Sequence, residues 1–246
     1  MRDAMRRVVR WAGGSEPLLL LLLLVVVGGV WGFIVLADEV RAGQTQRFDE
    51  WALRSLRRAD DPALPIGPAW LTEVGRDITA LGGVAVLVLM TTAVCGYLCL
   101  MRRFRALVFV LAATIGGLVV SQFLKSLFDR PRPAIVPHLS QAMSSSFPSG
   151  HSMMSAVVYL TLGTLLGTVV RGRKVQAYFL VVALLLSGLV GISRVYMGVH
   201  YPTDVLAGWM MGLAWAALCW WVARRLRRRG LDDDAAPVER RPRAGT

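Results

Sequence analysis

Long apolar runs alternate with short polar segments along most of the chain. Because an α-helix rises about 1.5 Å per residue, roughly 20 apolar residues cross the ~30 Å hydrocarbon core of a membrane. By this measure the pattern predicts about six membrane-spanning helices, at residues 18–36, 80–100, 106–124, 153–170, 177–192 and 205–222. The expected fold is therefore all-α, an integral membrane bundle that occupies residues 18–223.

The first apolar run follows an arginine-rich start and could be mistaken for a signal peptide. It is longer than an ordinary signal core, and no clear small-x-small cleavage pattern follows it. We therefore interpret residues 18–36 as a membrane anchor, with a cleaved signal peptide as the alternative. Residues 1–17 are a basic N-terminal segment, and the polar, charged end of the chain at 224–246 is expected to be disordered beyond its arginines.

The polar segment after the first run contains a helical pattern of its own. Phe48, Trp51, Ala52 and Leu56 recur at helical spacing, with charged residues between them. This pattern is typical of an amphipathic helix that lies in the membrane interface. It would either line the route of a lipid headgroup into a site or serve as a connector packed against the bundle.

Two pairs of glycines have the small-xxx-small spacing that lets membrane helices approach closely. Gly163 and Gly167 lie in the fourth apolar run, and Gly208 and Gly212 lie in the sixth. We expect these pairs to bring the fourth and sixth helices together.

The distribution of basic residues predicts how the chain is oriented. A net charge of +12 would suggest nucleic-acid binding in a soluble protein, but 55% of the residues here are hydrophobic. The arginines gather in alternate gaps between apolar runs, at 2–10, 102–105, 171–174 and 224–229. The positive-inside rule places these clusters in the cytoplasm. Both termini are then cytoplasmic, and no nucleic-acid partner is expected.

The remaining gaps must then face outward. They cover residues 37–79, 125–152 and 193–204. All the polar motifs described below lie in the last two of these gaps, so the candidate site is expected on the extracytoplasmic side. The compact chain and its arginine-rich, lysine-poor composition favour a bacterial plasma membrane.

The first polar motif is KSLFDRPRP, at residues 125–133. Lys125 and Arg132 would share a helix face if the helix were unbroken, but Pro131 and Pro133 interrupt it. Arg132 is therefore expected on a rigid turn, with its guanidinium folded back toward the Lys125 ammonium. Two cations that converge in this way favour the binding of an anion. In the alternative, these cations and Arg130 extend to lipid headgroups.

The second motif is PSGH, at residues 148–151. Ser149 and Gly150 lead directly into an apolar run, so their amides belong to the unpaired first turn of a helix, which binds phosphate oxygens readily. His151 would lie beside such an anion and give a proton to the leaving oxygen. Alternatively, Ser149 only caps the helix and His151 is an interfacial aromatic residue.

The third motif is SRVYMGVHYPTD, at residues 193–204. The planar guanidinium of Arg194 can donate two parallel hydrogen bonds, a geometry that suits phosphate. Asp204 lies within one turn of His200 and can accept its ring N–H, which would fix the tautomer and stabilise the cation formed when the other nitrogen attacks phosphorus. Alternatively, Asp204 caps the helix and His200 has a structural role. We assign no role to His138.

In combination, K-x6-RP, PSGH and SR-x5-H-x3-D occur in this order at predicted outward helix ends. The chain thereby resembles the type-2 phosphatidic acid phosphatase family. This family comprises integral membrane lipid phosphate phosphatases whose active-site fold is shared with vanadium haloperoxidases and bacterial acid phosphatases. Every signature position is filled, and the six-span layout extends the likeness to most of the chain outside its tails.

The resemblance implies a role for each matching residue. His200 would be the nucleophile that forms a phosphohistidine, Asp204 would orient it, and His151 would protonate the leaving group and then activate water. The phosphate-binding residues would be Lys125, Arg132, Ser149, Gly150 and Arg194. No metal or cofactor is expected, because the sequence also lacks the carboxylate and histidine clusters of a two-metal phosphatase.

The expected function is hydrolysis of a terminal phosphate from a membrane lipid. Undecaprenyl diphosphate is the leading candidate, ahead of phosphatidic acid, phosphatidylglycerol phosphate and diacylglycerol pyrophosphate. A lipid phosphotransferase would use the same phosphohistidine and remains open. A vanadate-dependent peroxidase is disfavoured in a membrane bundle, and a silent transporter or lipid-binding relative would be expected to lack His151 or His200. The partners are lipids, and the sequence assigns no oligomeric state.

Overall fold

The computed structural model describes residues 16–136, 145–169 and 172–228, which are mostly helical. In chain order the helices are α2 (Glu16–Arg41), α3 (Gln46–Ser55), α4 (Ala69–Leu81), α5 (Val84–Leu100), α6 (Phe104–Leu127), α7 (Gly150–Val169), α8 (Arg173–Tyr196) and α9 (Pro202–Arg228). The only bridge between extended residues in these ranges joins Arg57 and Pro65. The all-α prediction is therefore confirmed. The basic segment 1–15, His138 and the tail 229–246 lie outside the described residues.

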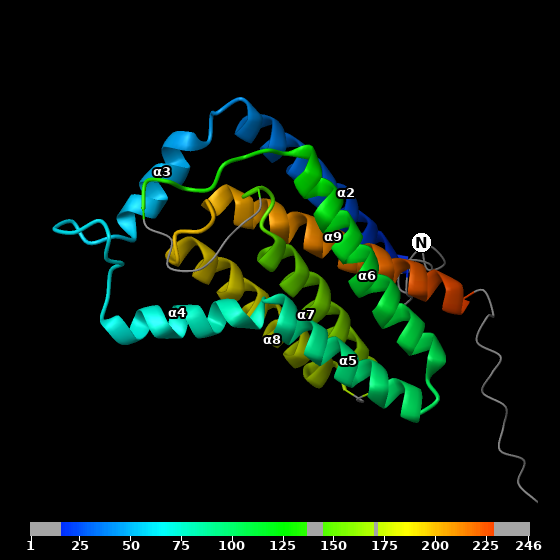
Figure 1. Ribbon diagram of the computed structural model, residues 1–246. Coiled ribbons are helices and arrows are strands. Elements are labelled where there is room, and N and C mark those ends of the chain that lie inside the picture. Colours follow the sequence, from blue (N-terminus) through cyan, green and yellow to red (C-terminus); the bar gives the residue numbers. More distant parts are fainter. Residues whose placement is uncertain (1–15, 137–144, 170–171, 229–246) are drawn as a thin grey trace, which may run out of the picture.

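Helix α7 is the centre of the bundle (Figure 1). It packs against α6, α8 and α9, while α2 packs against α9 and α5 packs against α6. Residues 152–163 of α7 are buried apart from Met154. Ser155 on this helix lies within hydrogen-bonding distance of Ser187 on α8, with 3.3 Å between their hydroxyl oxygens. Polar side chains are therefore tolerated on α7 because protein, and not lipid, surrounds it.

The surrounding helices expose apolar side chains, which indicates an integral membrane protein. Leu24 on α2, Val119 on α6 and Leu185 on α8 are examples. Within the described residues, α2, α6, α8 and α9 are each long and apolar enough to cross a membrane, and the bent pair α4–α5 makes a possible fifth span. The predicted count of six is not confirmed, because α7 is not in this set.

The second predicted span, 80–100, is wrong at its start. Residues 80 and 81 end α4, and α5 begins at Val84 after a bend of 46°. The bend is fixed by its neighbours, because Tyr159 on α7 donates its hydroxyl to the carbonyl of Leu81 at 2.7 Å. A Cβ on Gly82 would lie 2.4 Å from Val190 Cγ1, so only glycine allows this approach to α8. The apolar run therefore continues, but the helix does not.

The glycine pairs have different neighbours from those predicted. A Cβ on Gly208 would lie 2.6 Å from the Ser149 carbonyl oxygen, and one on Gly212 would lie 2.7 Å from the Met153 carbonyl. This pair does bring α9 onto α7. Gly163 instead faces Phe179 and Ala183 of α8, so the expectation that its pair faces the sixth apolar run is wrong.

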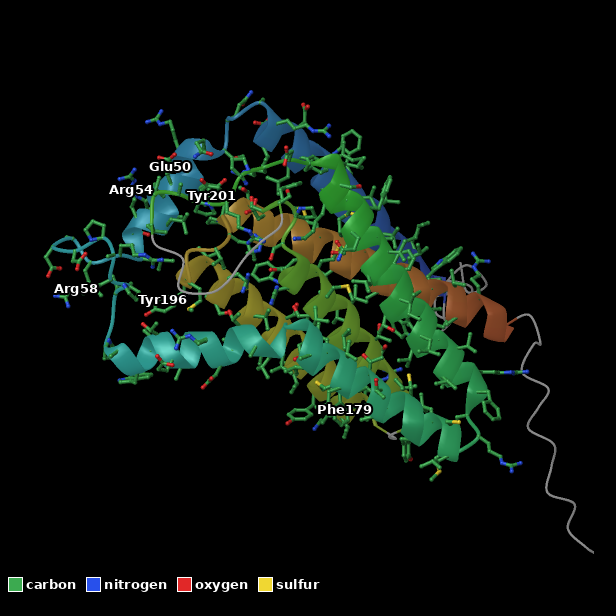
Figure 2. The ribbon with its side chains drawn as sticks, viewed as in Figure 1. Glu50, Arg54, Arg58, Phe179, Tyr196 and Tyr201 are labelled. Atoms are coloured by element: carbon green, nitrogen blue, oxygen red, sulfur yellow. The ribbon has the colours of Figure 1, made fainter. Side chains whose placement is uncertain are left out.

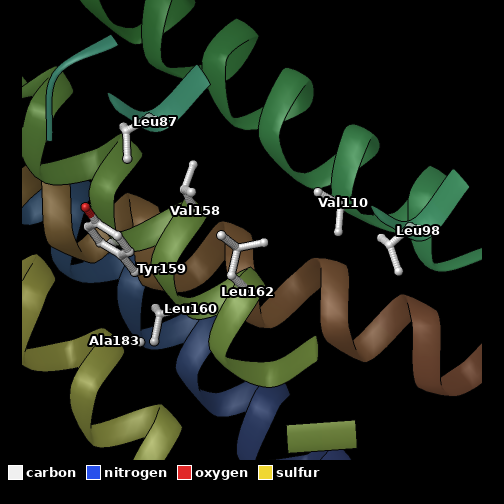
Figure 3. Packing of buried hydrophobic residues seen from close by; sticks show 9 residues of the cluster. Leu87, Leu98, Val110, Val158, Tyr159, Leu160, Leu162 and Ala183 are labelled. Carbon is white, nitrogen blue, oxygen red and sulfur yellow. The ribbon is translucent and has the colours of Figure 1, made fainter. Parts of the chain in front are cut away.

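One core cluster lies between α5, α6, α7 and α8 (Figure 3). It includes Leu87, Val110, Val158, Leu160 and Ala183. Burial of side chains of this size stabilises a fold by about 1.5–3 kcal/mol each in water, a gain that a membrane reduces because lipid is itself apolar. In the membrane, close packing holds these helices together.

The amphipathic segment does form a helix, α3, but its buried face is not the one that carries Phe48 and Trp51. Asp49 and Leu53 are fully buried at 0% exposure, whereas Phe48 is 53% and Trp51 is 65% exposed. Leu56 falls just beyond the helix end. The charged side of the pattern therefore contributes a carboxylate to the protein interior, and the aromatic residues point outward.

Candidate active site

The three polar motifs meet at one end of the bundle (Figure 1). They lie at the end of α6, the start of α7, the end of α8 and the start of α9. The Ser149 amide donates to the Asp204 carbonyl at 2.9 Å, and the Ser146 amide donates to the Arg130 carbonyl at 3.0 Å. These backbone hydrogen bonds join segments far apart in sequence, so the motifs form one site.

His200 is held between a carboxylate and a guanidinium. Its Nδ1 lies 3.4 Å from Asp204 Oδ2, and its Nε2 lies 3.1 Å from Arg132 Nη1. Because a guanidinium only donates hydrogen bonds, Nε2 must be the acceptor, and the proton of the neutral ring belongs on Nδ1, facing Asp204. The ring therefore presents an unprotonated nitrogen to the side where the cations gather.

The surroundings of His200 keep this ring neutral. Burial lowers the pKa of His200 to about 4, an effect that Asp204 opposes and that Arg194 and Arg132 reinforce. A neutral imidazole with a free lone pair is the form that can attack phosphorus. At neutral pH the ring is therefore ready to act as a nucleophile without first losing a proton.

Arg132 lies where the proline pattern predicts, in the irregular segment after α6. Its Nη1 also donates to the Val199 carbonyl at 2.8 Å, so the guanidinium is directed to the loop before α9. Lys125 approaches from the last turn of α6 and donates to the Ser145 carbonyl at 3.2 Å. A Cβ on Gly150 would lie only 3.1 Å from Lys125 Cε, so the glycine makes room for the lysine.

Arg194 contributes a buried cation at the end of α8. Its side chain is 2% exposed, and among the described residues its Nε has no hydrogen-bond partner. Buried donors in folded proteins are nearly always satisfied, so this arrangement fits a ligand that supplies an acceptor. A phosphate oxygen has the charge and geometry that a guanidinium prefers.

The predicted role of the Ser149 amide is wrong, because that amide already donates to the Asp204 carbonyl. The Ser149 hydroxyl is also buried and accepts a hydrogen bond from the Ser152 hydroxyl at 3.0 Å. The Ser152 amide lies 3.5 Å from the same hydroxyl oxygen, as expected if Ser149 caps α7, and phosphate binding by the Ser149 hydroxyl stays a prediction. The Gly150 amide, in the first turn of α7, stays a candidate phosphate donor.

His151 precedes the apolar part of α7 and faces the same cations. Burial, together with Arg194 and His200, lowers the pKa of His151 to about 3. The histidine is therefore neutral at pH 7. Because a bound phosphate carries up to two negative charges, it would favour protonation of His151, so the charge of the ligand itself can recruit this proton.

Sequence reasoning missed two residues of this site. Arg130 was considered only as a lipid-headgroup contact, yet its guanidinium bonds Asp204 Oδ1 at 2.6 Å and Asp49 Oδ2 at 2.8 Å. The headgroup alternative is therefore wrong for Arg130. Asp49 comes from α3, which covers the site near Tyr201 (Figure 2). No local pattern marks Asp49, because its partners lie more than 80 residues away in sequence.

An apolar helical bundle with two histidines, an aspartate and several arginines gathered at one end defines an integral membrane protein of the phosphatidic acid phosphatase class. The chain belongs to the PAP2 superfamily, whose family model matches residues 105–228. That range contains every predicted site residue. It does not contain α3.

Individual relatives agree with this assignment. The chain is 33% identical over 184 residues to phosphatidylglycerophosphatase B of Bacillus subtilis, a match that covers 74% of this chain and 86% of the relative. It is 33% identical over 107 residues to an undecaprenyl-diphosphatase of Sulfolobus acidocaldarius, covering 42% of this chain and 46% of that protein.

A solved structure shares the fold. The crystal structure of a transmembrane PAP2-type phosphatidylglycerolphosphate phosphatase from Bacillus subtilis superimposes with a TM-score of 0.75 at 30% identity. The superposition covers 83% of this chain and 98% of that one. The match therefore extends beyond the motifs to most of the helices.

Proposed function

We propose that this protein is a membrane lipid phosphatase that removes a terminal phosphate through a phosphohistidine. The observation that carries the proposal is the position of His200, with Nδ1 toward Asp204 and Nε2 toward Arg132. A phosphate that draws Arg132 away from Nε2 and is bound by the surrounding cations would present its phosphorus to the lone pair of Nε2.

In the first half of the reaction, Nε2 of His200 attacks phosphorus and the P–O bond to the lipid breaks. His151 gives its proton to the departing lipid oxygen, and Asp204 stabilises the ring, which becomes positive as the N–P bond forms. In the second half, water attacks the phosphorus of the phosphohistidine and gives a proton to His151. The P–N bond then breaks, which releases phosphate and restores the neutral His200.

Three side chains supply the positive charge that this transfer needs. Lys125, Arg132 and Arg194 approach from the end of α6, the following segment and the end of α8. Fixed cations stabilise charge on the transferring group without reorganising during the reaction. The proposed mechanism therefore requires no metal ion.

Among possible substrates we favour undecaprenyl diphosphate. One relative carries the name undecaprenyl-diphosphatase, and another carries the name phosphatidylglycerophosphatase B. Phosphatidylglycerol phosphate, phosphatidic acid and diacylglycerol pyrophosphate offer the same terminal phosphate and are the other candidates. In a lipid diphosphate the leaving group is a lipid phosphate, which departs more easily than the alkoxide of a phosphomonoester, so diphosphates should be turned over fastest.

The test is phosphate release by the purified protein from a panel of these lipids in detergent micelles. We expect release from at least one lipid, abolished in His200→Ala. The panel is run with and without an acceptor lipid. Phosphate appearing on the acceptor in place of free phosphate would identify a phosphotransferase, and no turnover of any lipid phosphate would refute the proposal.

We also propose that the site faces the extracytoplasmic side, with both termini in the cytoplasm. The arginine clusters support this orientation. A cysteine placed at Ala134 in a cysteine-free background should react with an impermeant thiol reagent in intact cells, and one at Arg173 should not. The reverse pattern would move the site to the cytoplasm and exclude outer-leaflet substrates.

A further inference from the structure

We propose that Asp49 and Arg130 are positioning residues for the reaction, acting through Asp204 to hold His200. The inference rests on the proposed function, since it concerns how the nucleophile is oriented. It adds a carboxylate from α3 and an arginine that lies at one of the unspecified positions of K-x6-RP.

Arg130 connects two buried carboxylates. Its Nη1 donates to Asp204 Oδ1 at 2.6 Å and to the Thr203 hydroxyl at 2.9 Å, and its Nη2 donates to Asp49 Oδ2 at 2.8 Å. Its side chain is 11% exposed, and both carboxylates are fully buried. These contacts use both protons of Nη1 and one proton of Nη2, so Arg130 is committed to the protein.

This commitment separates Arg130 from the phosphate-binding cations. Burial opposes its charge, but the carboxylates of Asp204 and Asp49 outweigh burial and raise the pKa of Arg130. Its guanidinium also stacks on the ring of Tyr201, with 4.3 Å from Cζ to the ring centroid. Arg130 therefore contacts the residues on either side of the α9 start, and it neutralises carboxylates instead of attracting an anion.

The contact with Asp204 fixes how that carboxylate faces His200. Asp204 Oδ2 accepts the Tyr201 amide at 2.9 Å and lies 3.4 Å from His200 Nδ1. Oδ1 is held by Arg130. Because each oxygen has its own donor, the carboxylate cannot rotate freely, and Oδ2 stays directed at the ring. Without Arg130 the remaining donors, the Tyr201 amide and the His200 ring itself, would both be on Oδ2 and Oδ1 would be unrestrained by the arginine.

Asp49 anchors this arrangement to the start of α9. Its Oδ1 accepts the Thr203 amide at 3.1 Å, and its Oδ2 accepts the Thr203 hydroxyl at 2.6 Å. The Thr203 amide is one of the unpaired donors in the first turn of α9, so Asp49 caps that helix from a distant segment. A carboxylate at a helix N-terminus also interacts favourably with the helix dipole.

The test compares Asp49→Asn and Arg130→Gln with Glu50→Gln, a change of the neighbouring residue on α3. Outer partners of metal-binding histidines typically contribute about 10- to 100-fold in activity, and we expect the same range for a histidine that acts as a nucleophile. We expect kcat to fall by about this factor in the first two variants and to stay at the parental value in Glu50→Gln. We expect KM, and the inhibition constant of inorganic phosphate, to change less than about threefold.

A direct phosphate ligand would behave differently. Its removal would raise KM and the phosphate inhibition constant together, and that result for Arg130→Gln would overturn the proposal. Parental kcat in Asp49→Asn would also overturn it. If Arg130→Gln does not fold, Asp49→Asn still decides the question, because this change keeps the size of the side chain. Arg130→Lys should keep only part of the parental kcat, because lysine lacks the forked pair of donors that arginine has.

A double-mutant cycle distinguishes positioning from a general loss of stability. If Arg130 acts through Asp204, adding Arg130→Gln to Asp204→Asn should reduce kcat less than about threefold further, because the oriented carboxylate is already lost. A full additional loss in the double variant would show an independent role. Failure of the proposed function itself has a different signature, since the parental protein would then release no phosphate from any lipid.

Discussion

Arg132 and His200 are in direct contact, with 3.1 Å between the Nη1 of the arginine and the Nε2 of the histidine. The lone pair that would attack phosphorus is therefore engaged by a hydrogen bond. In the proposed mechanism a phosphate that enters would take over this guanidinium, which would place an oxygen on Arg132 and leave Nε2 free. One cation would then both protect the nucleophile and receive the substrate.

The nucleophile prediction concerns trapped phosphoenzyme. His200→Ala should abolish turnover and any acid-labile phosphoenzyme after rapid quenching with labelled substrate. Asp204→Asn should keep the nucleophile but lose the oriented tautomer, and a comparable change in a serine protease lowers kcat by about 10⁴. Normal phosphoenzyme formation in His200→Ala would show that another residue attacks phosphorus.

The general acid prediction concerns the leaving group. His151→Ala should lose far more activity on a lipid phosphomonoester, whose alkoxide leaves poorly, than on a lipid diphosphate. General acid catalysis is typically worth about 10²- to 10⁴-fold, so kcat values on the two substrates should diverge measurably. Equal losses on both would indicate that His151 mainly binds phosphate.

The metal prediction follows from the fixed cations. Treatment with EDTA should leave phosphate release nearly unchanged, because Lys125, Arg132 and Arg194 would supply the charge that Mg²⁺ supplies elsewhere. Vanadate should inhibit, since it mimics the trigonal transition state. Activity abolished by EDTA and restored by Mg²⁺ would contradict the mechanism.

The pH prediction concerns the protonation of His200. Its pKa is lowered to about 4, first by burial, so the ring should stay neutral as the pH falls from 7 to about 5 and become protonated only below that range. Nitrogen NMR of histidine-labelled protein in detergent should show this, with a proton on Nδ1. His200→Gln assigns the signal among the three histidines of the chain. A midpoint between about pH 6 and 7 would refute it.

The packing prediction concerns the crossing of α7 and α9. Gly208→Ala would place a methyl group 2.6 Å from the Ser149 carbonyl, and such overpacking typically costs about 1–3 kcal/mol of folding free energy. The displaced backbone adjoins His151 and Asp204, so activity should fall as well. Gly188→Ala is the matched control, because nothing lies within 4 Å of its added Cβ. Equal thermal unfolding temperatures in detergent would show that the crossing tolerates the methyl group.

The part of the site predicted from sequence is the part encoded locally. His200 and Asp204 are four residues apart across the start of a helix, so their spacing alone brings the ring and the carboxylate together. Lys125 and Arg132 flank a helix end that prolines determine. Such pairs depend on a few backbone angles, which the sequence encodes directly.

The contacts that sequence reasoning missed are non-local. Asp49 is one of the charged residues between Phe48, Trp51, Ala52 and Leu56, a pattern that predicts an amphipathic helix in the membrane interface and no particular contact. In a membrane protein the apolar residues of such a helix can face the surroundings, so the polar side is the one directed inward. The sequence pattern identifies two faces but does not say which one meets the protein.

Helix continuity was also beyond the pattern. Residues 80–100 form one apolar run, and hydropathy alone does not reveal the turn at Gly82 and Gly83 that separates α4 from α5. Helix α7 shows a different limit of the hydropathy pattern. Its histidine, serine and threonine residues lower its apolar content, although it is the described helix that other helices enclose most. Apolar content reports exposure to lipid, and a helix surrounded by other helices needs less of it.

The ion pair between Asp49 and Arg130 limits how this enzyme can be recombined with its relatives. Arg130 lies inside the segment that the PAP2 family model matches, and Asp49 lies outside it. A chimera that joins residues 105–228 to a foreign N-terminal half would keep all three motifs and yet lose one carboxylate partner of Arg130. Grafts of this catalytic half should therefore work only when the donor of the first half supplies an acid at the same place on its α3.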